Sequence, residues 1–213
     1  MCGRKYDSEV AEKERQWWLG RSNLHRDILS ATKQMFDMGL QPNYDIRPTN
    51  PHVVVRARDG EAEPVVMSWG FQPPTMPRII INSRSDKLDS RAWSKAFRER
   101  RCLIPVGGYF EWTGPKGKRV PHAITLAQCP VLFLAGLWLE YDGEPRYSVI
   151  TTEPRDFMAR IHDREAVFVR DADCEEYLFS KEPPRGLLRP GEEGEIREFV
   201  CSSPVKDKPP EPV

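Results

Sequence analysis

A cysteine directly follows the initiator methionine in the opening stretch MCGRKYDSE. Removal of Met1 would give Cys2 a free α-amine beside its thiol, with reference pKa values of about 8 and about 8.5, so both groups would be nucleophilic at physiological pH. An aldehyde would condense with the amine to an imine, and the sulfur would then close a thiazolidine ring at the high effective concentration of a tethered reactant. Second residues are also often arbitrary, and a small residue there simply permits methionine removal. Cys2 alone is compatible with both explanations.

Three further polar residues occur where a strand pattern would predict apolar ones. Asn82 ends the run RIIIN, and Arg84 follows two positions later, on the same strand face if the chain stays extended. Glu111 lies in GGYFEWTG between Phe110 and Trp112. A carboxyl group packed among aromatic rings has a raised pKa, which suits a proton shuttle near neutral pH. Capping of a turn or pairing with a nearby arginine would explain Glu111 as well.

His162, in the stretch RIHDRE, is one of four histidines. The ordinary pKa of histidine lies close to physiological pH, which suits a general acid. A surface position at the end of a helix explains the same residue equally well.

Local groups of basic and aromatic residues could bind nucleic acid, because arginines contact phosphates and tryptophans stack on bases. A solvated helix face is the alternative for FRERR, where Glu99 lies among the arginines, and core packing is the alternative for tryptophans such as Trp93 and Trp138. The basic candidates are Arg4, Lys5, Arg98, Arg100, Arg101 and the turn PKGKR, and the aromatic candidates are the tryptophans of SWGF and EWTG.

The composition is ordinary for a soluble globular protein, with 213 residues, 39% hydrophobic and 30% charged. No apolar run approaches the length of a membrane helix and the start is polar, so we expect neither membrane insertion nor secretion. The formal net charge is zero, so binding to a polyanion would depend on a local basic surface. Five scattered cysteines without a CxxC pair argue against a zinc site or a disulfide framework and fit a reducing cytosol. They are Cys2, Cys102, Cys129, Cys174 and Cys201.

Helical spacing of apolar residues predicts two early helices, over 7–20 and 25–39, each ending at a glycine. A longer series of β-rich runs follows, with turn residues such as RDGEAEP, TGPKGK and YDGEP between many of them. Further helices are predicted near 89–100, 154–161 and 171–179. The β-rich runs are HVVVRA, PVVMSW, RIIIN, CLIP, YFEW, HAITL, VLFLAGLW and YSVITT.

These elements predict an α+β fold: a single compact domain with a mainly antiparallel, curved, barrel-like sheet and peripheral helices. The domain is expected to span residues 1–203. Residues 204–213 are rich in proline and lysine and have little to bury, so we expect a flexible tail there.

Several of these motifs also occur in one order that is far more specific than any of them alone. The series closely resembles the SOS response-associated peptidase (SRAP) family, whose members attach covalently to abasic sites in single-stranded DNA. The resemblance runs from Cys2 to about Val169, and CSSPV is similar to the closing strand of the family. The motifs are MCGR, PNYDIRPT, SWGF, INSRSD, RRCLIPVGGYFEW, LFLAGLW, VITT and IHDR.

The resemblance implies a catalytic role for four residues. Cys2, as the mature amino terminus, would attack the ring-opened aldehyde of the abasic sugar. Asn82 would hold the α-amine and the linkage, and Glu111 would shuttle protons as the Schiff base forms and resolves. His162 would help to open the sugar ring and would act in reversal of the crosslink.

The resemblance also implies how the DNA is held. Arg4, Arg84 and Arg164 would bind phosphates and Thr151 would line the groove. Trp69 and Gly70 would contact the splayed strand. The expected partner is single-stranded DNA with abasic sites, bound by a monomer without cofactor or metal, in the cytoplasm (at the nucleoid) or in the nucleus, according to the host.

The sequence departs from the family pattern in two places. The family commonly has Asn-Ala-Arg-x-Glu where this chain has NSRSD, which makes Ser83 bulkier and Asp86 shorter. Glu165 and Ala166 stand where the family usually has Met-Pro after HDR. A carboxylate next to Arg164 is expected to weaken the contact of that arginine with phosphate.

Two other functions remain open. A thiol peptidase would also use Cys2, in one form only to release its own Met1, but would not need the free α-amine. A non-catalytic module that binds single-stranded DNA would use the arginines and tryptophans and would tolerate loss of Cys2.

Overall fold

The protein forms two β-sheets. A computed structural model describes residues 3–7, 43–73, 77–129, 131–192 and 194–213. The helices predicted over 7–20 and 25–39 fall, apart from Asp7, outside these ranges. Cys2 also lies outside the described residues.

The larger sheet has eight strands, and its central members close into a barrel. Strands pair in the order β9-β3-β2-β5-β8, and β8 also pairs with β9. The turns Asp59–Gly60 and Asp142–Gly143 join β2 to β3 and β8 to β9, and both residues of each turn have positive φ, as tight hairpins require. The barrel strands are β2 (Pro51–Arg58), β3 (Glu61–Trp69), β5 (Arg101–Val106), β8 (Leu132–Tyr141) and β9 (Glu144–Thr152).

Three short strands extend this sheet around the end of β9. β4 (Asn82–Arg84) runs parallel to β9 and places Arg84 beside Thr151. β10 (Glu165–Ala166) pairs antiparallel with β9 and places Ala166 opposite Thr151. β11 (Phe168–Val169) pairs with β8. The end of β9 therefore gathers segments that are far apart in the sequence.

The strand predicted from RIIIN is displaced toward the C-terminus. Ile80 makes only an isolated bridge with Phe71, and the paired strand begins at Asn82. The carbonyl of Ile81 accepts hydrogen bonds from the Trp69 indole at 3.0 Å and from the backbone N–H of Val149 at 3.1 Å. The apolar run thus packs against the barrel before regular strand pairing starts.

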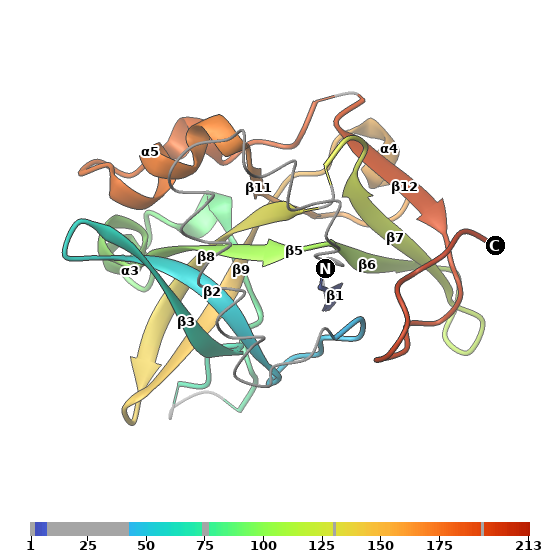
Figure 1. Cartoon of the computed structure of the whole chain (residues 1–213), viewed down its shortest axis with the longest axis horizontal. Coiled ribbons are helices and arrows are strands. Elements are labelled where there is room, and N and C mark those ends of the chain that lie inside the picture. Colours follow the sequence, from blue (N-terminus) through green and yellow to red (C-terminus); the bar gives the residue numbers. More distant parts are fainter. Residues whose placement is uncertain (1–2, 8–42, 74–76, 130, 193) are drawn as a thin grey trace.

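The smaller sheet has the order β1-β6-β7-β12, with all neighbours antiparallel. In Figure 1, β1 lies between the barrel strands on the left and β6, β7 and β12 on the right. The closing strand is residues 196–200 rather than the predicted CSSPV, of which Cys201 makes only an isolated bridge with Pro212. The strands are β1 (Arg4–Tyr6), β6 (Gly108–Thr113), β7 (Val120–Leu126) and β12 (Ile196–Val200).

The C-terminal tail contacts the rest of the protein. The backbone N–H of Tyr44 donates to the Lys206 carbonyl at 2.9 Å, and Val205 forms an isolated bridge with Lys208. These contacts do not measure motion, so the flexibility of residues 204–213 stays a prediction.

Short helices cover the barrel, as predicted, and Figure 1 shows α3 and α5 together at one end of it. Phe97 of α3 and Tyr177 of α5 are fully buried in one core cluster with Leu103 and Leu137 of the barrel. Arg101 is buried and donates to the carbonyls of Tyr177 and Ser180. This arginine therefore caps the C-terminal end of α5 instead of binding nucleic acid. The helices are α3 (Ser94–Glu99), α4 (Asp156–Ala159) and α5 (Cys174–Phe179), with 3-10 turns at Ser85–Lys87, Asp171–Asp173 and Arg185–Leu187.

The fold is therefore α+β with a mainly antiparallel, barrel-like sheet, which confirms the predicted class. A second core cluster joins the two sheets, with Tyr109 and Ile124 of the smaller sheet packed with Trp69 and Tyr147 of the barrel. Within the described ranges, no helix is both long and apolar enough to cross a membrane.

Candidate active site

The pairing of β1 with β6 determines what lies near the start of the chain. Arg4 is opposite Phe110 and Lys5 is opposite Tyr109, and one further step of this antiparallel register would bring Gly3 opposite Glu111. Consecutive Cα atoms are 3.8 Å apart, so the Cα of Cys2 can be at most ~7.6 Å from that of Arg4. The strand register thus brings β1, which begins at Arg4, to the part of β6 that carries Glu111.

Glu111 is buried, with 2% of its surface exposed, and burial raises the pKa of its carboxyl to about 7. The nearby negative charge of Asp163 also acts to raise this pKa. The predicted rise of the Glu111 pKa is thus confirmed, but the residues that surround the carboxyl differ from those expected. Phe110 and Trp112 pack on the other face of the sheet, with Tyr6, whereas the face of Glu111 is shared with Tyr109 and faces the barrel core.

His162 lies just after α4, and its Nδ1 atom has two competing partners. It accepts a hydrogen bond from the backbone N–H of Arg164 at 3.1 Å, and it lies 2.6 Å from a carboxylate oxygen of Asp163. The first contact requires an unprotonated Nδ1 and the second a protonated one. Burial lowers the pKa of His162, while Asp163 acts to raise it. Nδ1 can therefore gain or lose a proton, because it has a hydrogen-bond partner in either protonation state.

Arg84, Thr151 and Arg164 come together at the end of β9. Arg164 is mostly buried, and its Nη2 donates to the Thr151 carbonyl at 2.6 Å. The Thr151 hydroxyl is buried and makes no hydrogen bond with any described residue. Arg84 is exposed on β4. These three residues therefore lie close together, and both the binding of phosphate by the arginines and the place of Thr151 in a DNA groove stay predictions.

The carboxylate of Asp86, the last residue of the motif INSRSD, lies between the two arginines. Arg84 donates to both oxygens of Asp86, from Nε at 2.9 Å and from Nη2 at 2.8 Å. Arg164 approaches the same carboxylate at 3.5 Å. The hydrogen bonds from Arg84 lower the pKa of Asp86 to about 2, and Arg164 contributes to the shift.

Asn82 begins β4 opposite Val149 and is partly buried. Because strand side chains alternate, Asn82 and Arg84 share a face of β4. Ser83 points the other way, is buried, and its hydroxyl forms a 2.6 Å hydrogen bond with that of Ser148. The larger side chain at position 83 is accommodated by a polar partner.

Trp69 and Gly70 do not form a surface for DNA. The indole of Trp69 is fully buried, stacked on Tyr147, with the Lys5 Nζ 3.0 Å from its ring centroid. Gly70 is also buried and has a φ of 109°, and a Cβ there would meet Ile79 at 2.2 Å. Both residues build the core beneath the site, so a ring stacked on a base cannot come from Trp69 in this conformation.

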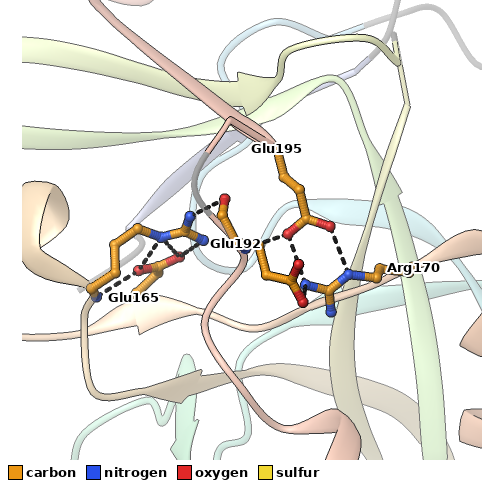
Figure 2. A network of polar contacts seen from close by, with 5 residues as sticks. Glu165, Arg170, Glu192 and Glu195 are labelled. Carbon is orange, nitrogen blue, oxygen red and sulfur yellow. Dashed lines mark hydrogen bonds and ion pairs between the residues drawn. The ribbon is translucent and has the colours of Figure 1, made fainter.

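Glu165 contacts Arg155, and no hydrogen bond or ion pair among the described residues joins it to Arg164; its effect on phosphate binding stays a prediction. Its carboxylate is fully buried and contacts Arg155 instead, at 3.1 Å from both the backbone N–H and the Nη2. Figure 2 shows Glu165 in a polar network that continues through Glu192 and Glu195 to Arg170, where Glu195 accepts two hydrogen bonds of 2.7 Å. The carboxylate that contacts Arg164 is that of Asp86.

Arg4 belongs to a second ion cluster, near β6. Its guanidinium lies 3.3 Å from the buried carboxylate of Asp45 and 5.4 Å from the Trp112 ring. Arg47 donates to the other oxygen of Asp45 at 2.8 Å. Both Asp45 and Arg47 lie in the motif PNYDIRPT, but neither residue was predicted to belong to the site. Two cations on one carboxylate place positive charge beside the strand that carries Glu111.

Three buried cysteines are poor nucleophiles. Burial raises the pKa of the thiols of Cys102, Cys174 and Cys201, which keeps them protonated at neutral pH. Among the described residues, no group of three or more histidine, cysteine or acidic side chains is placed to hold a metal ion.

Curated relatives cover most of this chain. An abasic site processing protein of Bacillus subtilis, YoaM, is 29% identical over 190 residues, which are 81% of this chain and 83% of that protein. The abasic site processing protein HMCES of Gallus gallus is 25% identical over 242 residues, covering 90% of this chain and 70% of its own.

Solved structures share the fold. A protein from Bacteroides thetaiotaomicron superposes with a TM-score of 0.71 at 18% identity, over 95% of this chain and 93% of that one. A phage-related protein from Bordetella bronchiseptica gives 0.70 at 20% identity, over 93% of both chains. The pattern of the SOS response associated peptidase family matches residues 1–207. The protein therefore belongs to the SOS response associated peptidase (SRAP) family.

Proposed function

We propose that this protein acts in the response to DNA damage by attaching covalently to abasic sites in single-stranded DNA. After loss of Met1, Cys2 would form a thiazolidine with the sugar aldehyde and so shield the site from strand cleavage. Relatives that cover most of the chain are named abasic site processing proteins. An aminothiol requires an aldehyde as its partner, and the ring-opened abasic sugar is one.

The observation that carries the proposal is the buried carboxyl of Glu111 on the strand that pairs with β1. With a pKa of about 7, this group is present in both protonation states near neutral pH. It can therefore give a proton and take one back within a single reaction cycle.

The chemistry needs both steps. The neutral α-amine of Cys2 adds to the aldehyde carbon, and the resulting hydroxyl leaves as water after receiving a proton from Glu111. The thiolate then adds to the imine carbon, and the nitrogen regains a proton. The sum is one carbon–nitrogen bond and one carbon–sulfur bond formed with the loss of one water molecule.

His162 and Asn82 would support these steps. A neutral His162 would help to open the closed sugar ring by transferring a proton, and it would act in the reverse reaction that releases the DNA. The alternative partners of its Nδ1, Arg164 N–H and Asp163, support a group that changes its protonation state. Asn82 would orient the α-amine and the linkage through its amide.

The DNA strand would be held through its phosphates. Arg84 and Arg164 at the end of β9 and Arg4 beside β6 would supply the cations for these contacts. Thr151 would line the groove between β4 and β10. We expect a monomer to bind one strand in this way.

Incubation with an oligonucleotide that contains one abasic site, followed by denaturing electrophoresis, tests the proposal. The parent protein should give a heat-stable shifted band, which a non-catalytic binding module would not give. Glu111→Gln keeps the shape of the side chain but cannot shuttle a proton, so attachment should slow by ~10²–10⁴-fold, the usual effect of losing a general acid–base. A Glu111→Gln variant that attaches at the parent rate would refute the role of this carboxyl.

A further inference from the structure

Asp86 connects the two arginines that are expected to bind phosphate. Its carboxylate accepts two hydrogen bonds from Arg84, at 2.9 and 2.8 Å, and lies 3.5 Å from Nη2 of Arg164. Arg84 and Asp86 are neighbours on β4 and the following 3-10 turn, whereas Arg164 comes from the segment before β10. One carboxylate thus contacts two cations that come from opposite sides of β9.

Two guanidinium groups around one anion would also bind a DNA phosphate. The guanidinium group of arginine binds carboxylate and phosphate with the same two-pronged geometry, so the two anions are alternatives at one fork. Arg84 uses Nε and Nη2 for Asp86, and a phosphate bound to the same pair of nitrogens has to displace that carboxylate. Arg164 keeps a buried Nε that has no hydrogen-bond partner among the described residues.

We propose that Asp86 is a built-in competitor of the DNA phosphate: it occupies the Arg84–Arg164 pair without DNA and is displaced when a strand binds. This inference rests on the proposed function, since it assumes that the pair binds DNA. Its consequence is that undamaged strands are held weakly and released, whereas an abasic strand is retained by its covalent bond. Asp86 therefore sets the discrimination between damaged and undamaged DNA.

The local geometry permits the exchange. The side chains of Arg84 and Asp86 are 54% and 41% exposed, so water and ions reach both. Exposed ion pairs contribute little to stability, which makes this contact easy to replace. Asp86 belongs to the 3-10 turn Ser85–Lys87 and not to a paired strand, so its side chain can leave the arginines without breaking the sheet. Asp163 and Glu153 also act on both arginines and add to the negative field.

The test compares Asp86→Asn with the parent in binding to an undamaged fluorescent oligothymidylate, measured by anisotropy at several KCl concentrations. Asp86→Asn should bind about two- to fivefold more tightly, the size expected from removing one exposed ion pair. Its affinity should also fall more steeply with salt, by up to about 0.7 in the log–log slope, the value of one phosphate contact in single-stranded DNA.

Asp89→Asn is the matched control. It changes the net charge equally, three residues away, but Asp89 pairs with Arg185 and not with Arg84 or Arg164. Its affinity and salt slope should equal those of the parent. An equal gain in both variants would mean that only net charge matters and would overturn the proposal.

A double variant tests whether Asp86 acts through the arginines. In an Arg84→Ala background, Asp86→Asn should give much less gain than in the parent, because the fork that the carboxylate blocks is gone. A full gain in that background would also overturn the proposal, as would unchanged or absent binding by Asp86→Asn.

The two proposals fail separately. Tighter binding by Asp86→Asn without any heat-stable band on abasic DNA would retract the thiazolidine chemistry and keep the competitor role. Crosslinking by the parent with no gain in Asp86→Asn would retract the competitor role alone.

Discussion

Arg4 of β1 lies directly opposite Phe110 of β6 in an antiparallel pair. One further step of this register would bring Gly3 opposite Glu111, so β1 and the segment of β6 that carries this buried carboxyl group meet in the fold. The reaction proposed here needs that meeting, because the nucleophile is the amino terminus and the proton shuttle has a pKa of about 7. The predictions below test the parts of this arrangement.

The unfolding free energy should depend on pH through Glu111. The pKa of this carboxyl is raised from 4.5 to about 7 by burial. Its contribution to stability is therefore fully present below pH 4.5 and is lost as the pH rises through about 7. The loss is on the order of 3 kcal/mol. Glu111→Gln cannot ionise, so in urea titrations its stability relative to the parent should rise across this range. A difference between the two proteins that is independent of pH would contradict the burial-induced shift.

His162→Ala should slow formation of the crosslink and, more strongly, its release, because the same group moves protons in both directions. Its side chain is partly exposed, so the melting temperature should stay close to that of the parent. Timed denaturing gels measure both rates. A sharp drop in melting temperature would instead make His162 structural and remove its catalytic role.

The sequence predicted most strands because local signals and tertiary context agree there. The run VLFLAGLW is almost uniformly apolar, as expected of a strand covered on both faces, and β8 contains most of it. The Asp-Gly pairs at 59–60 and 142–143 predicted turns that the structure confirms as hairpins. The resemblance to the SRAP family joined these strands into one ordered series of motifs. The family match over residues 1–207 confirms that resemblance.

Predictions were wrong where the partner of a segment decides its structure. RIIIN is as apolar as a strand, but pairing starts at Asn82, and CSSPV follows the closing strand and does not form it. Glu165 adjoins Arg164 in the sequence, yet its carboxylate contacts Arg155, because successive strand residues point in opposite directions. The contact of Asp86 with Arg164 joins residues far apart in the chain, so no local pattern indicates it.

Arg84→Ala should weaken binding of undamaged single strands to a similar extent for many sequences. A phosphate contact holds the strand without reading bases, so the loss should be independent of sequence and should reduce the salt dependence. Anisotropy with homopolymeric and mixed oligonucleotides measures this. A large change in base preference would contradict the assigned phosphate role.

The most direct test of the central claim is to block the α-amine of Cys2 while leaving its thiol in place. Protein that begins at Cys2 and protein with an uncleaved tag ahead of Cys2 are mixed with the same abasic oligonucleotide, and the products are timed on gels and weighed by mass spectrometry. Cys2→Ala, which keeps the amine but lacks the sulfur, serves as the second control and should give no thiazolidine. The account predicts that only protein with a free Cys2 forms a heat-stable product, with the summed mass of both partners minus one water. Equally fast attachment by the tagged protein would contradict the aminothiol mechanism and favour a thiol nucleophile acting alone.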